Sequence, residues 1–278
     1  MKNKFKITVI IILVAAVSFL VSVYYNRLKK NEKNKVIKVS GNIEATDVRL
    51  SFRIAGKIKE LLTDEGRLVK AGEILARLDT DELSKIKAEA AAALKAAEYQ
   101  FGLDKADYER AENLFNAGSI SAQKRDLAKT KADADKANVE ALEASLDLAN
   151  TRLGFADLVS PIDGFVLVKS AEAGEVVQAG STVFTVANLQ DIWLTAYINE
   201  TDLGRVKLNQ TAEIRTDTYP GKVYQGRISF ISQESEFTPK QIQTTEERVK
   251  LVYRIKVQVD NTNLELKPGM PADGYITE

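Results

Sequence analysis

The chain has 278 residues, enough for one large domain or two to three small ones, and 45% of them are hydrophobic, as in an ordinary globular protein. Lysine plus arginine equals aspartate plus glutamate at 39 each, so no overall positive field would attract nucleic acid. Cysteine and histidine are both absent, which excludes disulfides, thiolate nucleophiles, imidazole bases and zinc-finger sites. We therefore expect no nucleic-acid partner and no metal site, and only carboxylates, hydroxyls and lysines remain for chemistry.

The N-terminal segment is strongly apolar. Residues 7–25 read ITVIIILVAAVSFLVSVYY, nineteen residues without a charge. As a helix this segment rises about 28 Å, close to the thickness of the hydrocarbon core of a bilayer. A cleaved secretory signal is the competing interpretation, but the apolar stretch is long for one and no small-x-small site follows it. We therefore predict a single transmembrane anchor and a charged linker that ends at residue 35.

The charges around this anchor bear on its orientation. Five cations follow the span and outnumber the three lysines before it: Arg27, Lys29, Lys30, Lys33 and Lys35. By the positive-inside rule alone, this count places the large domain in the cytoplasm.

A short motif occurs twice, 108 residues apart. Residues 54–78 and 162–186 share six identities in twenty-five positions, and three of these identities are glycines with the same two spacings. The matched glycines are Gly56, Gly66 and Gly72 in the first copy and Gly164, Gly174 and Gly180 in the second. Each copy predicts alternating strands joined by glycine turns. Because one copy is too small to bury a core, we predict that the two copies face each other in a β-sandwich.

Between the copies, residues 81–153 are rich in strong helix formers and contain no proline. Apolar residues recur at the three-and-four spacing of a coiled-coil seam, which Asp104 interrupts once. The predicted seams are Ala90, Leu94, Ala97, Phe101, Tyr108, Ala111 and Phe115 in the first arm and Val139, Leu142, Leu146, Ala149 and Leu153 in the second. We predict an antiparallel coiled-coil hairpin about 50 Å long, rather than helices folded into a globular core, because alanine is too abundant on the seam for such a core.

The tip of this hairpin lies between the two arms. Gly118 is expected in a left-handed helix cap, and Ser119 or Ser121 is expected to cap the next helix.

Residues 190–278 alternate as strands with glycine and proline breaks and predict a β-barrel-like domain, which a strand beginning near residue 36 joins. Trp193 is expected in the core of this barrel, and the polar residues 235–247 are expected to form a loop. The predicted class is α+β, mostly β with a long helical hairpin. Its parts are the anchor and linker (1–35), the first strand and half-motif (36–80), the hairpin (81–153), the second half-motif (154–189) and the barrel (190–278).

The two half-motifs resemble the biotinyl/lipoyl-carrier fold, in which a tight turn between the halves presents a modifiable lysine. Here the hairpin replaces that turn, so a prosthetic group is not expected even though Lys85 and Lys87 lie nearby. The order of anchor, half-motif, hairpin, half-motif and barrel resembles the membrane fusion protein, or HlyD-like periplasmic adaptor, family over nearly the whole chain. The segment LKPGMPADGYI at residues 266–276 is similar to the closing turn and strand of that family.

At the predicted tip, Arg110, Leu114 and Ser121 match the Arg-x3-Leu-x6-Ser signature with which adaptors of tripartite efflux pumps dock a TolC-like outer-membrane channel. Each residue also has an ordinary interpretation, as a surface charge, an apolar seam residue and a helix cap. The resemblance implies a non-enzymatic adaptor between that channel and an inner-membrane transporter, expected to be of the ABC type.

The same resemblance implies self-association into a ring, expected to be a hexamer, and a single-pass inner-membrane protein whose soluble part is periplasmic. It therefore overrides the charge count around the anchor. Two alternatives remain, a lipoyl- or biotinyl-type carrier domain of a transfer enzyme and a membrane-anchored coiled-coil scaffold without a channel partner.

Overall fold

The computed structural model describes residues 36–237 and 251–277. The predicted anchor at residues 7–25 and most of the predicted polar loop lie outside the described residues. Within the described residues, no helix has the length and apolar character needed to cross a membrane. The chain divides into two compact units, Asp47–Ala187 and the combination of Met1–Thr46 with Asn188–Glu278.

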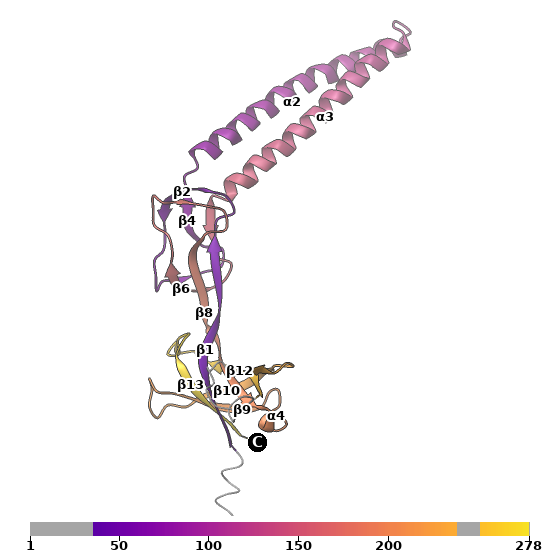
Figure 1. The fold of residues 1–278 in the computed structure, drawn as a ribbon. Helices are drawn as coiled ribbons and strands as arrows, with labels where there is room; N and C mark the ends of the chain where they lie inside the picture. The colour runs from indigo at the N-terminus through magenta and orange to yellow at the C-terminus, as the bar shows by residue number, and fades with distance from the viewer. Residues whose placement is uncertain (1–35, 238–250, 278) are drawn as a thin grey trace, which may run out of the picture. The chain divides into compact units, whose positions relative to one another are not determined.

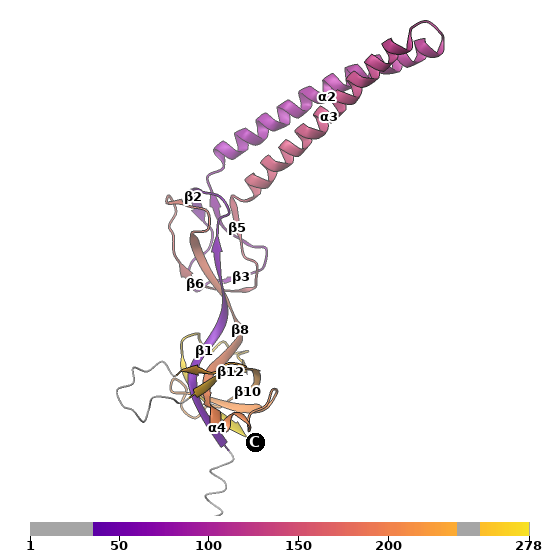
Figure 2. The ribbon, with the colours of Figure 1, turned by 45° about the vertical axis from the view of Figure 1, so that its right-hand side comes forward.

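The unit Asp47–Ala187 contains both copies of the repeated motif (Figures 1 and 2). The first copy forms β2 (Gly56–Leu61), β3 (Leu68–Val69) and β4 (Ile74–Leu78). The second follows β5 (Asp157–Val159) and forms β6 (Gly164–Lys169), β7 (Val176–Val177) and the beginning of β8 (Thr182–Asn199). The copies are interleaved, because β2 pairs with β7 and β3 pairs with β6. The predicted sandwich of two facing copies is confirmed.

Backbone hydrogen bonds between the copies follow the 108-residue offset. The Gly66 N–H donates to the Val166 carbonyl at 2.8 Å, and the Gly174 N–H donates to the Ile58 carbonyl at 2.8 Å. Each of these four residues has its counterpart 108 positions away, so the two bonds are equivalent under the repeat. Gly66 and Gly174 have φ of 78° and 93°, a region that residues with a Cβ rarely adopt.

The second pair of matched turn glycines repeats this arrangement. The Gly72 N–H donates to the Ser160 carbonyl at 2.7 Å, and the Gly180 N–H donates to the Phe52 carbonyl at 3.0 Å. These glycines also have positive φ, 83° and 84°. The repeat therefore encodes paired turns whose backbone amides tie each half to the other half.

Two long helices connect β4 to β5. The 36-residue α2 (Asp81–Asn116) and the 33-residue α3 (Ala122–Gly154) lie side by side in both views (Figures 1 and 2). The residues expected on the seams are half-buried or buried, and Ala97 and Ala149 are only 8% and 6% exposed. Asp104 is 2% exposed, so this carboxylate occupies the seam and does not end it.

The other unit contains a closed β-barrel. Besides β8, its strands are β1 (Val36–Ser51), β9 (Thr211–Thr216), β10 (Tyr224–Ile231), β12 (Leu251–Asp260) and β13 (Pro271–Thr277). The ring follows the order β12, β10, β9, β13, β1 and β8, and β8 pairs back with β12. The core side chains include Ile192, Leu194, Ile214, Ile228 and Ile255, all with no exposed surface.

Two small elements accompany the barrel strands. A one-turn helix, α4 (Glu200–Leu203), follows β8, and β11 (Glu236–Phe237) pairs with the beginning of β12. The barrel expected from the sequence is confirmed, whereas two residues of the segment expected to be a loop form β11.

Trp193 is not a core residue of this barrel, so that prediction was wrong. Its neighbours Ile192 and Leu194 are fully buried, and the alternation of side chains along β8 turns Trp193 to the opposite face. There its Nε1 donates to Thr195 Oγ1 at 3.0 Å, and Lys256 Nζ lies 4.2 Å from the centre of its ring. The position of Trp193 in the alternation of side chains along β8 decides which face of the sheet its indole occupies, even though the indole is large and apolar.

Candidate functional site at the hairpin tip

The end of α2 is closed by a Schellman-type turn. The Gly118 N–H donates to the Phe115 carbonyl and the Ser119 N–H donates to the Leu114 carbonyl, both at 2.8 Å. Gly118 has φ of 71°, the left-handed conformation expected of it. The turn thus reverses the chain within a few residues and satisfies carbonyls that the end of a helix leaves without partners.

The beginning of α3 is capped by Ser121. Its backbone is extended, and its Oγ accepts a hydrogen bond from the Lys124 N–H at 3.4 Å. Of the two serines considered from the sequence, Ser121 is the cap, while Ser119 belongs to the turn that ends α2.

The other two residues of the signature lie on α2. Arg110 and Leu114 are four residues apart, about one helical turn, and therefore share a face of the helix. The Arg110 side chain is 65% exposed and Leu114 is 49% exposed. Arg110 forms an ion pair with Asp107, which is also exposed, and exposed pairs of this kind are weak. The structure therefore brings all three residues to the same end of the hairpin, with Arg110 and Leu114 accessible to a partner.

A second arginine near the tip has a different environment. The Arg125 guanidinium lies 4.4 Å from the centre of the Phe115 ring on the facing helix. Its Nε and Nη2 donate to Asp126 Oδ1 at 2.8 and 2.6 Å, and this hydrogen bonding raises the pKa of Arg125. Arg125 therefore joins the two helices, whereas Arg110 faces outward. The sequence interpretation missed Arg125, although extending the second seam toward the tip by its own spacing reaches this residue.

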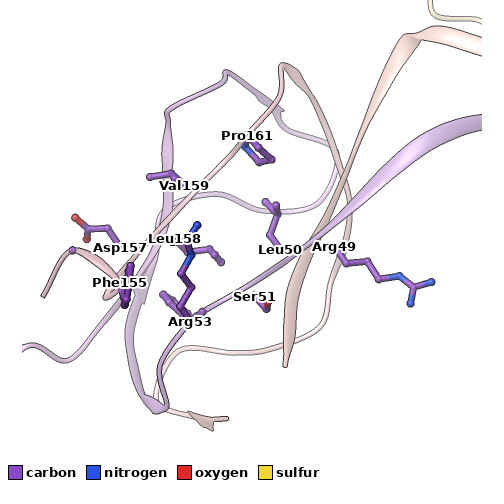
Figure 3. Close-up of a pocket in the computed structure, with 11 residues that line it drawn as sticks. Arg49, Leu50, Ser51, Arg53, Phe155, Asp157, Leu158, Val159 and Pro161 are labelled. Carbon is purple, nitrogen blue, oxygen red and sulfur yellow. The ribbon is translucent and has the colours of Figure 1, made fainter. Parts of the chain in front are cut away.

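A cleft of about 420 Å³ lies elsewhere in the same unit, between the end of β1 and the segment around β5 (Figure 3). The Arg53 guanidinium lies 5.1 Å from the centre of the Phe155 ring, and the apolar residues Leu158, Val159 and Pro161 also line the cleft. The carboxylate on the rim, Asp157, is 3.3 Å from Arg77. Within 36–237 and 251–277, no group of three or more acidic side chains is arranged to hold a metal ion.

Two family models match the chain. The CzcB-like barrel-sandwich hybrid domain matches residues 46–188, and the YknX-like β-barrel domain matches residues 192–273. The chain belongs to the membrane fusion protein family of HlyD-like periplasmic adaptors. In this membrane fusion protein the first matched domain coincides closely with the unit Asp47–Ala187, and the second lies within the other unit. The family expected from the sequence is thus confirmed.

The chain is also similar to a relative known from its sequence and to two solved structures. A relative in Yersinia pseudotuberculosis, named UPF0194 membrane protein, is 29% identical over an alignment that covers 97% of each chain. The crystal structure of MacA from Actinobacillus actinomycetemcomitans has a TM-score of 0.74 at 24% identity and covers 87% of this chain and 78% of that chain. The membrane fusion protein Spr0693 from Streptococcus pneumoniae R6 has a TM-score of 0.70 at 16% identity and covers 87% of this chain and 99% of that chain. At these identities, the likeness to the two solved structures shows the fold.

Proposed function

We propose that this membrane fusion protein is the adaptor that links an inner-membrane transporter of the ABC type to a TolC-like outer-membrane channel for efflux or secretion. The observation that carries the proposal is the hairpin tip, where exposed Arg110 and Leu114 lie one turn apart beside the Ser121 cap. A guanidinium donates several directed hydrogen bonds to carbonyl or carboxylate oxygens, and a leucine supplies an apolar contact. Together they suit the docking of another protein.

The proposal includes the anchor and the location of the protein. In this proposal residues 7–25, which lie outside the described residues, anchor the protein in the inner membrane with a single span, and the soluble part lies in the periplasm. The anchor therefore holds the sandwich, hairpin and barrel on the side where an outer-membrane channel can be reached.

The outer faces of the two helices support assembly of several hairpins side by side. On α3, exposed small or apolar residues recur at alternating intervals of three and four: Leu127, Thr130, Ala134, Ala137, Ala141, Ala144 and Leu148. On α2, a similar series that is exposed except at Ala106 comprises Ala92, Ala96, Tyr99, Leu103 and Ala106. Such spacing is typical of a coiled-coil seam. Because the two faces differ, their contact is heterologous and can close into a ring, for which we propose six copies.

Crosslinking at the tip tests the docking. Because the chain contains no cysteine, Leu114→Cys introduces a unique thiol for a bifunctional reagent applied to intact cells. We expect an adduct with an outer-membrane channel, identified by mass spectrometry. Adding Arg110→Asp should reduce the yield of this adduct at least about tenfold, the effect of losing roughly 1.4 kcal/mol of binding free energy.

Lys105→Asp is the matched control, because Lys105 is an exposed cation on a different face of α2. This charge reversal should leave the adduct unchanged. Docking through the tip would be rejected if no channel adduct forms, or if both charge reversals lower the yield equally. Absence of the adduct would favour the scaffold alternative.

The carrier alternative is tested separately by the intact mass of the native protein. Lys85 and Lys87, the lysines nearest to the position of a carrier's modified lysine, lie within α2 and not in a turn between strands. We expect an unmodified mass. A lipoyl or biotinyl adduct would favour the carrier.

A further inference from the structure

A polar layer interrupts the apolar seam between α2 and α3. Its centre is Asp104 of α2, which is 2% exposed. Gln100 Nε2 donates to Asp104 Oδ2 at 2.8 Å, and Lys131 Nζ of α3 lies 2.8 Å from Asp104 Oδ1. Each carboxylate oxygen of Asp104 therefore has a partner, as a buried charge requires.

A second carboxyl group, that of Asp135, belongs to the same layer. Asp135 lies one turn beyond Lys131 on α3, on the side of the helix from which Lys131 reaches Asp104 of α2. Its Oδ2 is buried and has no hydrogen-bond donor among the described residues. Because Lys131 reaches Asp104 and Asp135 lies one turn from Lys131, the two carboxyl groups are neighbours across the seam, and each is the first cause of the pKa shift of the other. Ionised carboxylates can only accept hydrogen bonds, so a hydrogen bond between these two groups needs a proton on one of them, and the buried Oδ2 without a donor disfavours the ionised form of Asp135.

The charges that face this pair from both helices support a shared proton. From α2 the pair meets the neutral amide of Gln100, and from α3 it meets the ammonium group of Lys131. With one proton between the carboxyl groups, the layer contains one carboxylate and one ammonium and is neutral. Without that proton, the layer carries a second negative charge with a buried oxygen, and the two carboxylates repel each other.

We propose that Asp104 and Asp135 share one proton across the seam, and that loss of this proton loosens the middle of the hairpin, making its stability sensitive to the external pH. The proposal concerns the hairpin itself and does not depend on what its tip binds. A polar layer of this kind also specifies the register of two helices, because only one alignment brings its partners together.

The pKa directions agree with this arrangement and fix the sign of the pH dependence. The contact with Asp104 is the largest cause that raises the pKa of Asp135 above 3.8, and the contact with Asp135 is the largest cause that lowers the pKa of Asp104 to about 2. The stability contributed by Asp135 is therefore present below pH 3.8 and is lost as the pH rises through its raised pKa. That of Asp104 is lost as the pH falls through about 2, so the pair favours a mildly acidic optimum.

The test is Asp135→Asn in the full chain, held in detergent micelles. The amide can donate permanently to Asp104, as the protonated carboxyl does, but it does not titrate. Thermal unfolding is followed by helical circular dichroism in a series of buffers between about pH 4 and pH 8, a range chosen to bracket the raised pKa of a carboxyl group. We expect the melting temperature of the unmodified protein to fall relative to that of the variant as the pH rises, by about 2–4 °C over the series.

Two further variants keep the result decisive. Asp147→Asn makes the same change at an exposed position of α3 and should follow the unmodified protein at every pH. Asp104→Asn removes the charged partner of Lys131, so its melting temperature should be lower at every pH. It should also lack the decrease of melting temperature with rising pH that the pair produces. Hydrogen exchange of peptides covering residues 98–106 and 128–138 should show the same pH dependence. The proposal is overturned if the Asp135→Asn and Asp104→Asn variants retain the slope of the unmodified protein, or if the exchange changes lie outside these peptides.

Discussion

The sandwich and the hairpin are each made of two paired segments, the two copies of the motif in the sandwich and the helices α2 and α3 in the hairpin. Different interactions stabilise the two pairs. The sandwich buries large apolar side chains such as Phe52 and Phe184, which are 1% and 0% exposed, and adds reciprocal backbone hydrogen bonds between its halves. In the described hairpin, the buried side chains are three alanines and Asp104. Hydrophobic stabilisation scales with the apolar area removed from water. Truncating a buried side chain should therefore lower the free energy of unfolding more in the sandwich than in the hairpin. The hairpin should respond more to helix propensity and to charge.

The largest expected effect comes from truncating the sandwich core. Phe184→Ala should lower the free energy of unfolding of that region by about 3–5 kcal/mol, because a buried aromatic side chain leaves a cavity. Leu146→Ala on the half-buried seam of α3 should cost clearly less. Native-state hydrogen exchange of the full chain measures the opening free energy of each region. Equal decreases in the opening free energies of the sandwich and the hairpin would contradict the difference described between them.

The next effect distinguishes the two halves of the repeat. A Cβ on Gly164 would lie 2.5 Å from the Ala187 carbonyl oxygen, a backbone atom, whereas a Cβ on Gly56 would meet the end of the Leu78 side chain at 3.0 Å. Gly164→Ala should therefore cost about 1–3 kcal/mol or more, and Gly56→Ala should cost less because that side chain can move. Urea denaturation compares the two variants. A larger loss at Gly56 would contradict the packing described for these positions.

The barrel and the hairpin should respond to opposite ends of the pH scale. Burial and a 3.0 Å hydrogen bond to Glu265 raise the pKa of Tyr224 to about 12. Its contribution to stability is present below the unfolded value of 10.0 and is lost as the pH rises through about 12. Tyr224→Phe should cost about 0.5–1.5 kcal/mol at neutral pH, and the difference from the unmodified protein should shrink above pH 10. Urea denaturation at neutral and alkaline pH checks this expectation, and a constant difference would contradict it.

The smallest expected effect has the opposite sign. Gly102 lies inside α2, and a Cβ added there meets no heavy atom within 4 Å. Gly102→Ala should stabilise the hairpin by about 0.5–1 kcal/mol, because glycine loses more backbone entropy in a helix than alanine does. The thermal unfolding of the helices measures the gain. A glycine-to-alanine substitution would thus destabilise the sandwich at Gly164 and stabilise the hairpin at Gly102. A decrease in helix stability in the Gly102→Ala variant would contradict this contrast.

Much of the fold was predictable because its signals are local. The glycines at 66, 72, 174 and 180 were expected at turns, and each has the positive φ that only a residue without a Cβ adopts readily. The seams were expected from their spacing, because helical geometry places residues three and four apart on one face. Gly118 and Ser121 end one helix and begin the next for reasons contained within a few residues.

Other features depended on partners distant in sequence. The interpretation of Asp104 as a break in the seam could not include Lys131 and Asp135, because their contact requires the register of the two helices. The docking signature pointed to Arg110 alone. The contact of Arg125 with the ring of Phe115 could not be predicted in the same way, because it joins two different helices.

Turns, caps and heptad seams follow from the sequence by itself, because φ preferences and helical periodicity act over a few neighbouring residues. The tertiary structure decides which strand pairs with which, where the indole of Trp193 points and which buried carboxyl groups meet. Each of these depends on a surface that forms only when segments far apart in the chain pack together. For this protein the repeat reveals that two halves assemble, and the folded chain reveals that the halves interleave and that the helices inserted between them bury Asp104 beside Lys131.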